Sequence, residues 1–376
     1  MESLVTMFGG YYHGKRVLVT GHTGFKGAWL SLWLKQLGAE VCGVALPAET
    51  TPNLHGIIQP GTFASESQTD IRHAAKLEQA VQEARPDFVF HLAAQALVRR
   101  SYAEPVETMQ TNVLGTVHLL EAVRRLNRPV PVLIVTTDKC YENHGWDHGY
   151  RETDALGGHD VYSASKAACE IVVAAWRRSF FQPDAKLGNV ATARAGNVIG
   201  GGDFAADRIV PDCIRALAGK TPIRVRNPHA TRPWQHVFDC LSGYLWLGAR
   251  LAVAPKNSPL ADAFNFGPAL QSNRTARALV EELLKHWPGK WVDASDPGAL
   301  HEAGRLHLAI DKSAAQLGWR PTWDFAAAVK QTALWYRRHA GRRGPGLRAF
   351  SLKQIENFTR EARAQGQVWA AAGKTK

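Results

Sequence analysis

The sequence predicts an α/β fold, built as a doubly wound parallel sheet with a smaller C-terminal lobe. The main observation is a regular alternation of strand-like and helix-like segments between Val17 and Gly200, which is typical of parallel sheets with helices on both faces. A second observation is the length, because 376 residues suffice for one large domain or two small ones. No apolar run approaches the length needed to cross a bilayer, so we expect no membrane partner.

The individual elements follow from their apolar patterns. Val17–Thr20 is apolar and β-branched and predicts a buried strand, and Ala28–Leu37 has the apolar spacing of a helix. The same reasoning predicts strands at Glu40–Leu46, Pro86–Ala94, Pro131–Cys140 and Asn189–Gly200, and helices at Ala74–Ala84, Thr108–Arg125, Ser163–Phe180, Thr275–Trp287 and Phe325–Arg338.

Three glycines follow the first predicted strand, in the segment GHTGFKG at Gly21, Gly24 and Gly27. A strand, a glycine turn and a helix N-terminus together present free backbone N–H groups to a phosphate. The G-x-x-G-x-x-G spacing resembles the short-chain dehydrogenase/reductase superfamily, which implies a Rossmann sheet that binds a dinucleotide at its carboxyl edge.

The resemblance also indicates which residues hold the dinucleotide. Leu46, Pro47 and Ala48 stand where an NAD-binding unit usually has an acid for the ribose, with Glu49 a little further on, and no arginine follows the strand directly. We therefore expect NAD rather than NADP. The residues implied for cofactor binding are Gly21, Thr23, Gly24, Phe25, Lys26, Gly27, Asp70, Ile71, Leu92, Ala93, Ala94, Gln95, Asn112, Thr136, Tyr162 and Lys166.

The expected organisation is an NAD-binding Rossmann domain at residues 1–195, which residues 234–266 rejoin. Residues 196–233 and 267–376 are expected to form a substrate-binding lobe and a basic C-terminal tail, since Pro, Arg, Trp and His become frequent after Gly200. Met1–Gly14 lacks the basic start and apolar core of a secretory signal, and we expect it to be a loose arm.

Charge and cysteine usage narrow the class of protein. The net charge of +12 suits nucleic acid, an acidic membrane surface or an anionic small substrate. The basic C-terminal stretch has no aromatic interleaving and no nucleic-acid motif, so we expect a solvated helix with a frayed end and no nucleic-acid partner. The five cysteines are far apart and lack Cys-x-x-Cys spacing, which predicts free thiols in the cytoplasm and no metal site.

Tyr162 and Lys166 are spaced as Tyr-x-x-x-Lys, which places both side chains on one face of a helix. An ammonium beside a phenol favours the phenolate, so Tyr162 is a candidate base near neutral pH, and Lys166 is also expected to hold the nicotinamide ribose. A surface tyrosine near a lysine is the alternative. Asn112 is expected behind this pair, bridging a helix and a strand.

The segment VTTDKCYEN, residues 135–143, specifies the chemistry further. Thr137 is placed to hydrogen-bond a substrate oxygen, and two charged side chains, Asp138 and Lys139, follow it at the edge of the sheet, where burying them is costly without a function. With GHTGFKG, GNVIGGGDFAADRIVPD, ATRPWQHV and LGWRPTWD, this segment resembles the CDP-glucose branch of the nucleotide-sugar 4,6-dehydratases, lyases whose other branches carry Thr-Asp-Glu here.

The resemblance implies a cycle in which C4 of CDP-glucose is oxidised, water is lost across C5 and C6, and hydride returns to C6. In that cycle Tyr162 is the base at C4, Thr137 polarises the C4 oxygen, and Asp138 is the acid at C6. Lys139 is the expected base at C5, which requires a neutral amine with a depressed pKa. The alternative is that Lys139 only orients Asp138.

The resemblance also implies a diphosphate site and an assembly. Arginine suits a diphosphate because its planar fork donates two hydrogen bonds, although a surface ion pair is the alternative, above all for Arg305. We expect a homodimer or a dimer of dimers through Thr108–Arg125 and Ser163–Phe180. The implied substrate-binding residues are Asn197, Arg208, Arg232, His236, His301 and Arg305.

Two other functions remain open at this point. Another nucleotide-sugar 4,6-dehydratase, or a 4-epimerase, would keep the glycines, Tyr162 and Lys166, although an epimerase does not need Asp138 and Lys139. A non-catalytic dinucleotide sensor is the more distant alternative, and such proteins often lose the tyrosine or the lysine.

Overall fold

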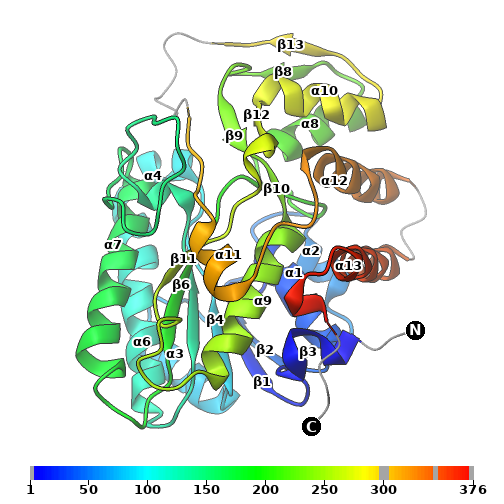
Figure 1. The fold of residues 1–376 in the computed structure, drawn as a ribbon. Coiled ribbons are helices and arrows are strands. Elements are labelled where there is room, and N and C mark those ends of the chain that lie inside the picture. Colours follow the sequence, from blue (N-terminus) through cyan, green and yellow to red (C-terminus); the bar gives the residue numbers. More distant parts are fainter. Residues whose placement is uncertain (1–3, 296–304, 342–345, 372–376) are drawn as a thin grey trace.

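The computed structural model describes residues 4–295, 305–341 and 346–371. Its centre is a seven-stranded sheet in the order β11-β6-β5-β4-β1-β2-β3, with every neighbouring pair parallel (Figure 1). This confirms the predicted doubly wound parallel sheet. The strands are β1 (Arg16–Thr20), β2 (Glu40–Ala45), β3 (Phe63–Gln68), β4 (Phe88–His91), β5 (Val132–Val135), β6 (Val190–Arg194) and β11 (Ala263–Asn265).

Helices cover both faces of the sheet, which is why its central strands are apolar on both sides. On one face α3 (Ala74–Ala84), α6 (Gly115–Arg125) and α7 (Val161–Trp176) enclose one apolar core. On the other face α1 (Phe25–Gln36) and α9 (Val237–Val253) enclose a second core that continues into the C-terminal lobe. The two long helices predicted on the first face are present, each with a π-helical segment, Gln110–Leu114 and Arg177–Phe181.

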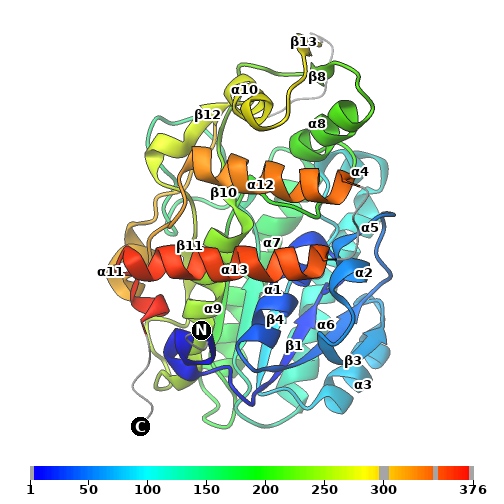
Figure 2. The ribbon, with the colours of Figure 1, turned by 90° about the vertical axis from the view of Figure 1, so that its right-hand side faces the viewer.

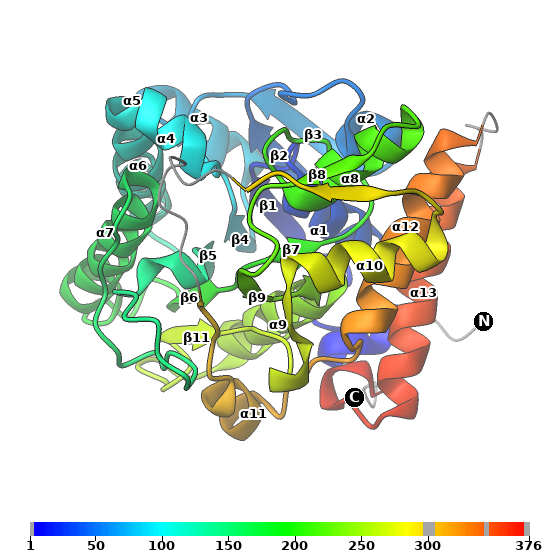
Figure 3. The same cartoon turned by 90° about the horizontal axis from the view of Figure 1, so that it is seen from above.

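The smaller lobe lies beyond the carboxyl ends of the strands, as the view from above shows (Figure 3). The strand predicted at residues 189–200 is wrong in extent: it ends at Arg194, because Asn197 adopts a positive φ of 50° that an extended strand excludes. The lobe and its connections contain α8 (Ile209–Ala218), α10 (Ala276–His286), α11 (Asp311–Leu317), α12 (Phe325–Ala340), β7 (Val198–Ile199), β8 (Ile223–Val225), β9 (Thr231–Pro233), β10 (Gln235–His236), β12 (Asn273–Thr275) and β13 (Trp291–Asp293).

Within the segment 234–266, α9 packs on the sheet and β11 pairs with β6. The boundaries of the two domains stay a prediction. Short helices around the edge of the sheet complete the structure: α2 (Leu54–Ile58), α4 (Val98–Ala103) and α5 (Pro105–Met109). No helix in the described ranges combines the length and the apolarity that a bilayer span requires.

The first and last segments that the structure describes are packed, in contrast to the predicted loose arm; the last two lysines of the predicted frayed tail, Lys374 and Lys376, lie outside the described residues. The N-terminal turn Leu4–Gly10 buries Phe8, whose ring stacks on that of Trp369 with centroids 5.1 Å apart. The helix α13 (Leu347–Ala364) buries Ile355 and Phe358 and packs against α1 and α2 (Figure 2). The reason is that each segment carries apolar and aromatic side chains that complete the core over α1.

Candidate active site

A large cavity of about 1750 Å³ lies between the carboxyl ends of the strands and the C-terminal lobe. It opens above the boundary between β1 and β4, the point where the strand order reverses and where such folds bind their ligands. Its walls come from the glycine turn after β1, the ends of β4, β5 and β6, and the segment that leads to α8 and β9. The cavity is larger than the usual small-molecule pocket of roughly 300–1000 Å³, so it has room for two ligands.

The three glycines of the turn meet different neighbours. A Cβ on Gly21, which has a φ of +73°, would lie 2.6 Å from the amide nitrogen of Ala93, and one on Gly27 would lie 2.1 Å from the Gly21 oxygen. A Cβ on Gly24 would meet nothing closer than that oxygen at 3.4 Å. The first and third glycines are therefore required by the fold, whereas the second leaves an open backbone at the N-terminus of α1, which no side chain caps.

The other residues predicted for the dinucleotide surround this turn. Thr23 donates to the Leu46 carbonyl at 2.8 Å, and Asp70 is held by Arg72 at 2.6 Å, which keeps the pKa of the Asp70 carboxyl low. Glu49, the nearest acid to the ribose position, forms an ion pair with Arg100 of α4 at 2.7 Å. The cavity is lined by Phe25, Lys26, Ile71, Leu92, Ala93, Ala94, Gln95 and Thr136.

Asn112 lies behind α7, the helix of Tyr162 and Lys166, and does not line the cavity. Its Oδ1 accepts from the backbone N–H of Gln95 at 2.9 Å, and its Nδ2 donates to the Gln95 carbonyl and to the Ser165 hydroxyl at 3.0 and 2.8 Å. The side chain thus connects the segment after β4 to α7. It positions Gln95, which lines the cavity, without lining the cavity itself.

The five predicted catalytic residues lie together at the carboxyl end of β5 and on α7. Tyr162 and Lys166 occupy successive turns of α7, and both are buried. The Thr137 hydroxyl donates to Asp138 at 2.9 Å, and the Asp138 carboxylate is fully buried. A short 3₁₀ turn from Asp138 to Cys140 bends the chain here and directs both charged side chains to one region.

The environment of Tyr162 differs from the phenolate predicted from the sequence. Burial raises the pKa of Tyr162 to about 12, against a hydrogen bond with Thr137 that lowers it, and the Asp138 charge raises it further. The amine of Lys166 donates to the Val135 carbonyl at 3.4 Å, and burial lowers the pKa of Lys166 as well. Burial therefore shifts the pKa values of both members of the pair in the direction of their neutral forms.

Lys139 also differs from the desolvated amine predicted for a C5 base. Its side chain is 29% exposed, and its Nζ lies 4.0 Å from the Asp138 carboxylate. Lys26, in the first turn of α1, is a further lysine that lines this cavity. Its Nζ lies 3.5 Å from the Tyr244 hydroxyl, and burial lowers the pKa of Lys26, with the Asp138 charge acting in the opposite direction.

The residues predicted for the diphosphate divide into two groups. Asn197, Arg208 and Arg232 line the cavity. Asn197 donates from Nδ2 to the Asp138 carboxylate at 3.0 Å, and Arg208 is paired with the buried Asp203 at 2.8 Å. The structure therefore places Asn197 against Asp138, the predicted acid, as well as in the cavity wall.

Two of the other three predicted residues, His236 and Arg305, do not line the cavity. His236 caps the N-terminus of α9, where its Nδ1 accepts from the Phe238 amide at 3.2 Å and its ring packs on Trp323. Burial in this apolar setting lowers the pKa of His236 to about 3. Arg305 forms a surface ion pair with Asp147, which was the alternative for this residue. His301 lies outside the described residues.

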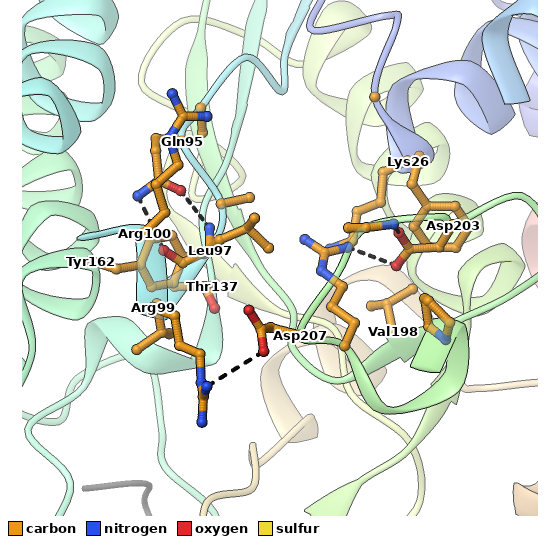
Figure 4. Close-up of a pocket in the computed structure, with 18 of the residues that line it drawn as sticks. Lys26, Gln95, Leu97, Arg99, Arg100, Thr137, Tyr162, Val198, Asp203 and Asp207 are labelled. Atoms are coloured by element: carbon orange, nitrogen blue, oxygen red, sulfur yellow. Dashed lines mark hydrogen bonds and ion pairs between the residues drawn. The ribbon is translucent and has the colours of Figure 1, made fainter. Parts of the chain in front are cut away.

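Several arginines that line the cavity have acidic partners that sequence reasoning missed. Figure 4 shows Arg99 of α4 paired with Asp207 of the opposite wall, at 3.5 Å, so that an ion pair joins the two sides of the cavity. The same view shows Tyr162 beside Thr137. Asp203 and Asp207 stand in the quoted segment GGDFAADRIV, but sequence spacing does not reveal which arginine each one contacts.

The sheet order, the glycine turn and the Tyr162–Lys166 pair at the switch point define a dinucleotide-dependent protein of the short-chain dehydrogenase/reductase class. Comparison with known families agrees. The sequence pattern of the GDP-mannose 4,6 dehydratase family matches residues 18–260. The chain therefore belongs to this family of nucleotide-sugar dehydratases.

Individual relatives place the chain further within the family. It is 42% identical to the CDP-glucose 4,6-dehydratase of Salmonella typhimurium, over 93% of this chain and 97% of that protein. Among solved structures, it is similar to a double mutant of the dTDP-glucose 4,6-dehydratase DesIV of Streptomyces venezuelae, with NAD and DAU bound (TM-score 0.71, 26% identity, 87% of this chain and 98% of that chain).

A UDP-glucose 4-epimerase of Thermotoga maritima, solved with UDP-glucose, has a TM-score of 0.74 at 20% identity, covering 86% of this chain and 99% of that chain. Dehydratases and epimerases thus share this fold, and the fold alone does not separate the two reactions.

Proposed function

We propose that the chain is a CDP-glucose 4,6-dehydratase, a lyase that converts CDP-D-glucose into CDP-4-dehydro-6-deoxy-D-glucose and water. The observation that carries this proposal is the position of Asp138 and Lys139, which line the cavity beside Tyr162 at the carboxyl end of β5. An epimerase needs a base at C4 only. A carboxyl group and an amine next to that base are what an elimination across C5 and C6 requires.

NAD is the proposed cofactor, and the residues present suit it. The open backbone at Gly24 and the uncapped N-terminus of α1 suit a diphosphate, and the small side chains of Ala93 and Ala94 leave room above β4. When bound, NAD would supply the redox chemistry of the cycle, as the hydride acceptor for C4 and the hydride donor for C6. Lys166 would hold its ribose, and Asp70 and Ile71 its adenine.

The remaining chemistry belongs to side chains of this chain. Tyr162 would take the proton of the C4 hydroxyl, with the Thr137 hydroxyl donating to the developing oxygen. Asp138, held by Thr137 and Asn197, would give a proton to the departing C6 hydroxyl. Lys139 is the proposed base at C5, and Arg208 and Arg232 would bind the diphosphate.

The reaction itself tests the proposal. Protein incubated with NAD and CDP-glucose should give a 4-keto sugar, detected by its ultraviolet absorbance in alkali, and deuterium placed on C4 should appear on C6. Parallel reactions with dTDP-glucose, UDP-glucose and GDP-mannose test the base specificity. A product that is inverted at C4 and keeps its C6 hydroxyl would instead identify an epimerase.

We further propose a homodimer. Apolar side chains are exposed along the outer helices of the sheet, namely Val106, Met109, Leu114, Ile171 and Phe180. Burying such a patch against a second copy is favourable. Light scattering on the native protein should give twice the mass of one chain, and Ile171→Arg should shift it toward the monomer. We also infer a cytoplasmic location, since all five cysteines are buried free thiols.

A further inference from the structure

A second group of chemically active side chains lies outside the cavity, behind the glycine turn. His22 belongs to that turn, His55 to α2 and Glu66 to β3. The Nε2 atoms of His22 and His55 lie 2.9 and 2.5 Å from the same carboxylate oxygen, Oε1 of Glu66. All three possible ligand atoms lie within 4.8 Å of one another.

The surroundings hold these side chains in place. His22 is 2% exposed and packs over Gly43 of β2, where a Cβ would lie 2.6 Å from the imidazole ring. The ring of Phe63 contacts both imidazoles, with centroids 5.0 and 5.5 Å away. The side chains of His55 and Glu66 are 15% and 27% exposed, so the group can be reached from solvent.

The donor set suits a transition metal. Two imidazoles and one carboxylate are ligands that Zn²⁺ prefers, whereas Mg²⁺ and Ca²⁺ prefer oxygen alone. Burial lowers the pKa of His22, which favours the neutral imidazole that coordinates metals. Burial opposes ionisation of Glu66, but hydrogen bonds from His55 and Gln59 outweigh it and lower the pKa of that carboxyl.

We propose that His22, His55 and Glu66 form a zinc site that ties the glycine turn to α2 and β3. Ligand atoms of a tetrahedral zinc, with bonds of about 2.0–2.2 Å, lie roughly 3.3 Å apart. The present separations from Glu66 Oε1 therefore require movements of less than about 1 Å. Water, or the exposed side chain of Gln59 that now contacts the other Glu66 oxygen at 3.1 Å, would complete the coordination.

This proposal departs from the absence of metal that the sequence predicts. That prediction rested on cysteine spacing, and the three ligands here come from separate segments with no motif that joins them. The site would be structural, since none of its ligands lines the cavity. Its zinc affinity can therefore be measured without NAD or sugar nucleotide, so that the proposal stands or falls independently of the proposed dehydratase activity.

The test is a zinc titration of the full chain, purified without a histidine tag and stripped with a chelator. In competition with a chromophoric chelator, the native protein should bind one zinc per chain. His55→Ala and Glu66→Gln should each weaken that binding at least about tenfold. The matched control is His286→Ala, because His286 lies 3.7 Å from Glu282 and no third ligand joins them among the described residues; it should bind zinc like the native protein.

Thermal unfolding provides a second readout that does not depend on the chelator. A metal that binds only the folded state raises the melting temperature. Zinc should therefore stabilise the native protein and His286→Ala, but not His55→Ala. A native protein that binds no zinc in the competition, or variants that bind it as tightly as the native protein, would overturn the proposal and leave a hydrogen-bonded cluster only.

Discussion

The two walls of the cavity present different kinds of groups to a ligand. The wall formed by the glycine turn and the end of β4 presents backbone and small side chains, from Gly21 to Gly27 and from Leu92 to Ala94. The opposite wall, between Asn197 and Arg232, presents charged side chains that are already paired with acids, such as Arg208 with Asp203. The shape of the first wall depends on the absence of side-chain atoms at its glycines. The second wall depends on which acid each charged side chain pairs with.

The proposed catalytic residues lie between these walls, and the largest expected effect is there. Tyr162→Phe removes only one hydroxyl and should lower turnover by about 10²- to 10⁴-fold, because the general base at C4 is lost. The measurement is formation of the 4-keto product from CDP-glucose. Tyr11→Phe, at the N-terminal turn, is the matched control and should leave turnover unchanged; an equal loss in both variants would contradict the assignment.

Lys139 tests whether the charged side chains do chemistry or only orient one another. If Lys139 takes the C5 proton, Lys139→Ala should lower dehydration by about 10²- to 10⁴-fold while NADH still forms transiently. Lys139→Glu gives the Thr-Asp-Glu sequence expected for the other branches of the family. This variant should recover part of the activity. Product release at the native rate in Lys139→Ala would exclude the C5 role.

The backbone wall is tested by two glycines. Gly27→Ala should destabilise the protein by about 3 kcal/mol, since the new Cβ would lie 2.1 Å from a backbone oxygen. Gly24→Ala meets only a 3.4 Å contact, so it should keep its melting temperature and lose affinity for NAD. Denaturant unfolding and a dinucleotide titration separate the two outcomes. A Gly24→Ala protein that binds NAD normally would contradict the proposed diphosphate position.

Asp239 connects the sheet to the lobe and predicts a pH dependence. Its backbone partners are the amides of Thr322 and Trp323, and burial raises the pKa of its carboxyl to about 7. The unfolded value is about 3.9, so between these values the folded state binds the extra proton. Asp239 therefore makes stability fall as pH rises from about 4 to about 7.

Asp239→Asn keeps the acceptor oxygen and removes this titration. Its melting temperature should depend less on pH over that range and should exceed that of the native protein at pH values above about 7. Asp184→Asn, an exposed position, is the control and should follow the native curve. If the melting temperature of Asp239→Asn depended on pH as that of the native protein does, Asp239 would not be the source of this pH dependence.

The smallest expected effect concerns the ion pair that joins the two walls. Arg99→Ala should change the free energy of substrate binding by no more than about 1 kcal/mol, because both side chains are over 40% exposed. Asp207 also keeps Arg226 at 2.8 Å. KM should rise slightly with kcat unchanged, and Arg178→Ala should change neither. A large loss of kcat would mean that Arg99 contacts the reacting sugar.

The comparison of walls also explains what the sequence predicted and what it did not. The sheet, the glycine turn and the position of Asn112 behind α7 were predictable because steric limits and helical spacing act over a few residues. The partners of Arg208 and Arg99, and the burial of His236 under Trp323, depend on segments that meet only in the fold. The packed ends were missed for the same reason, since Phe8 finds its stacking partner at Trp369.

That last contact also bears on shortened variants of the chain. In the native protein the ring of Phe8 is covered by that of Trp369, which follows α13. A variant that stops before α13 would lack this stacking partner and the apolar side chains with which α13 covers α1. Its aromatic layer would face solvent, so we expect such a variant to self-associate through this surface.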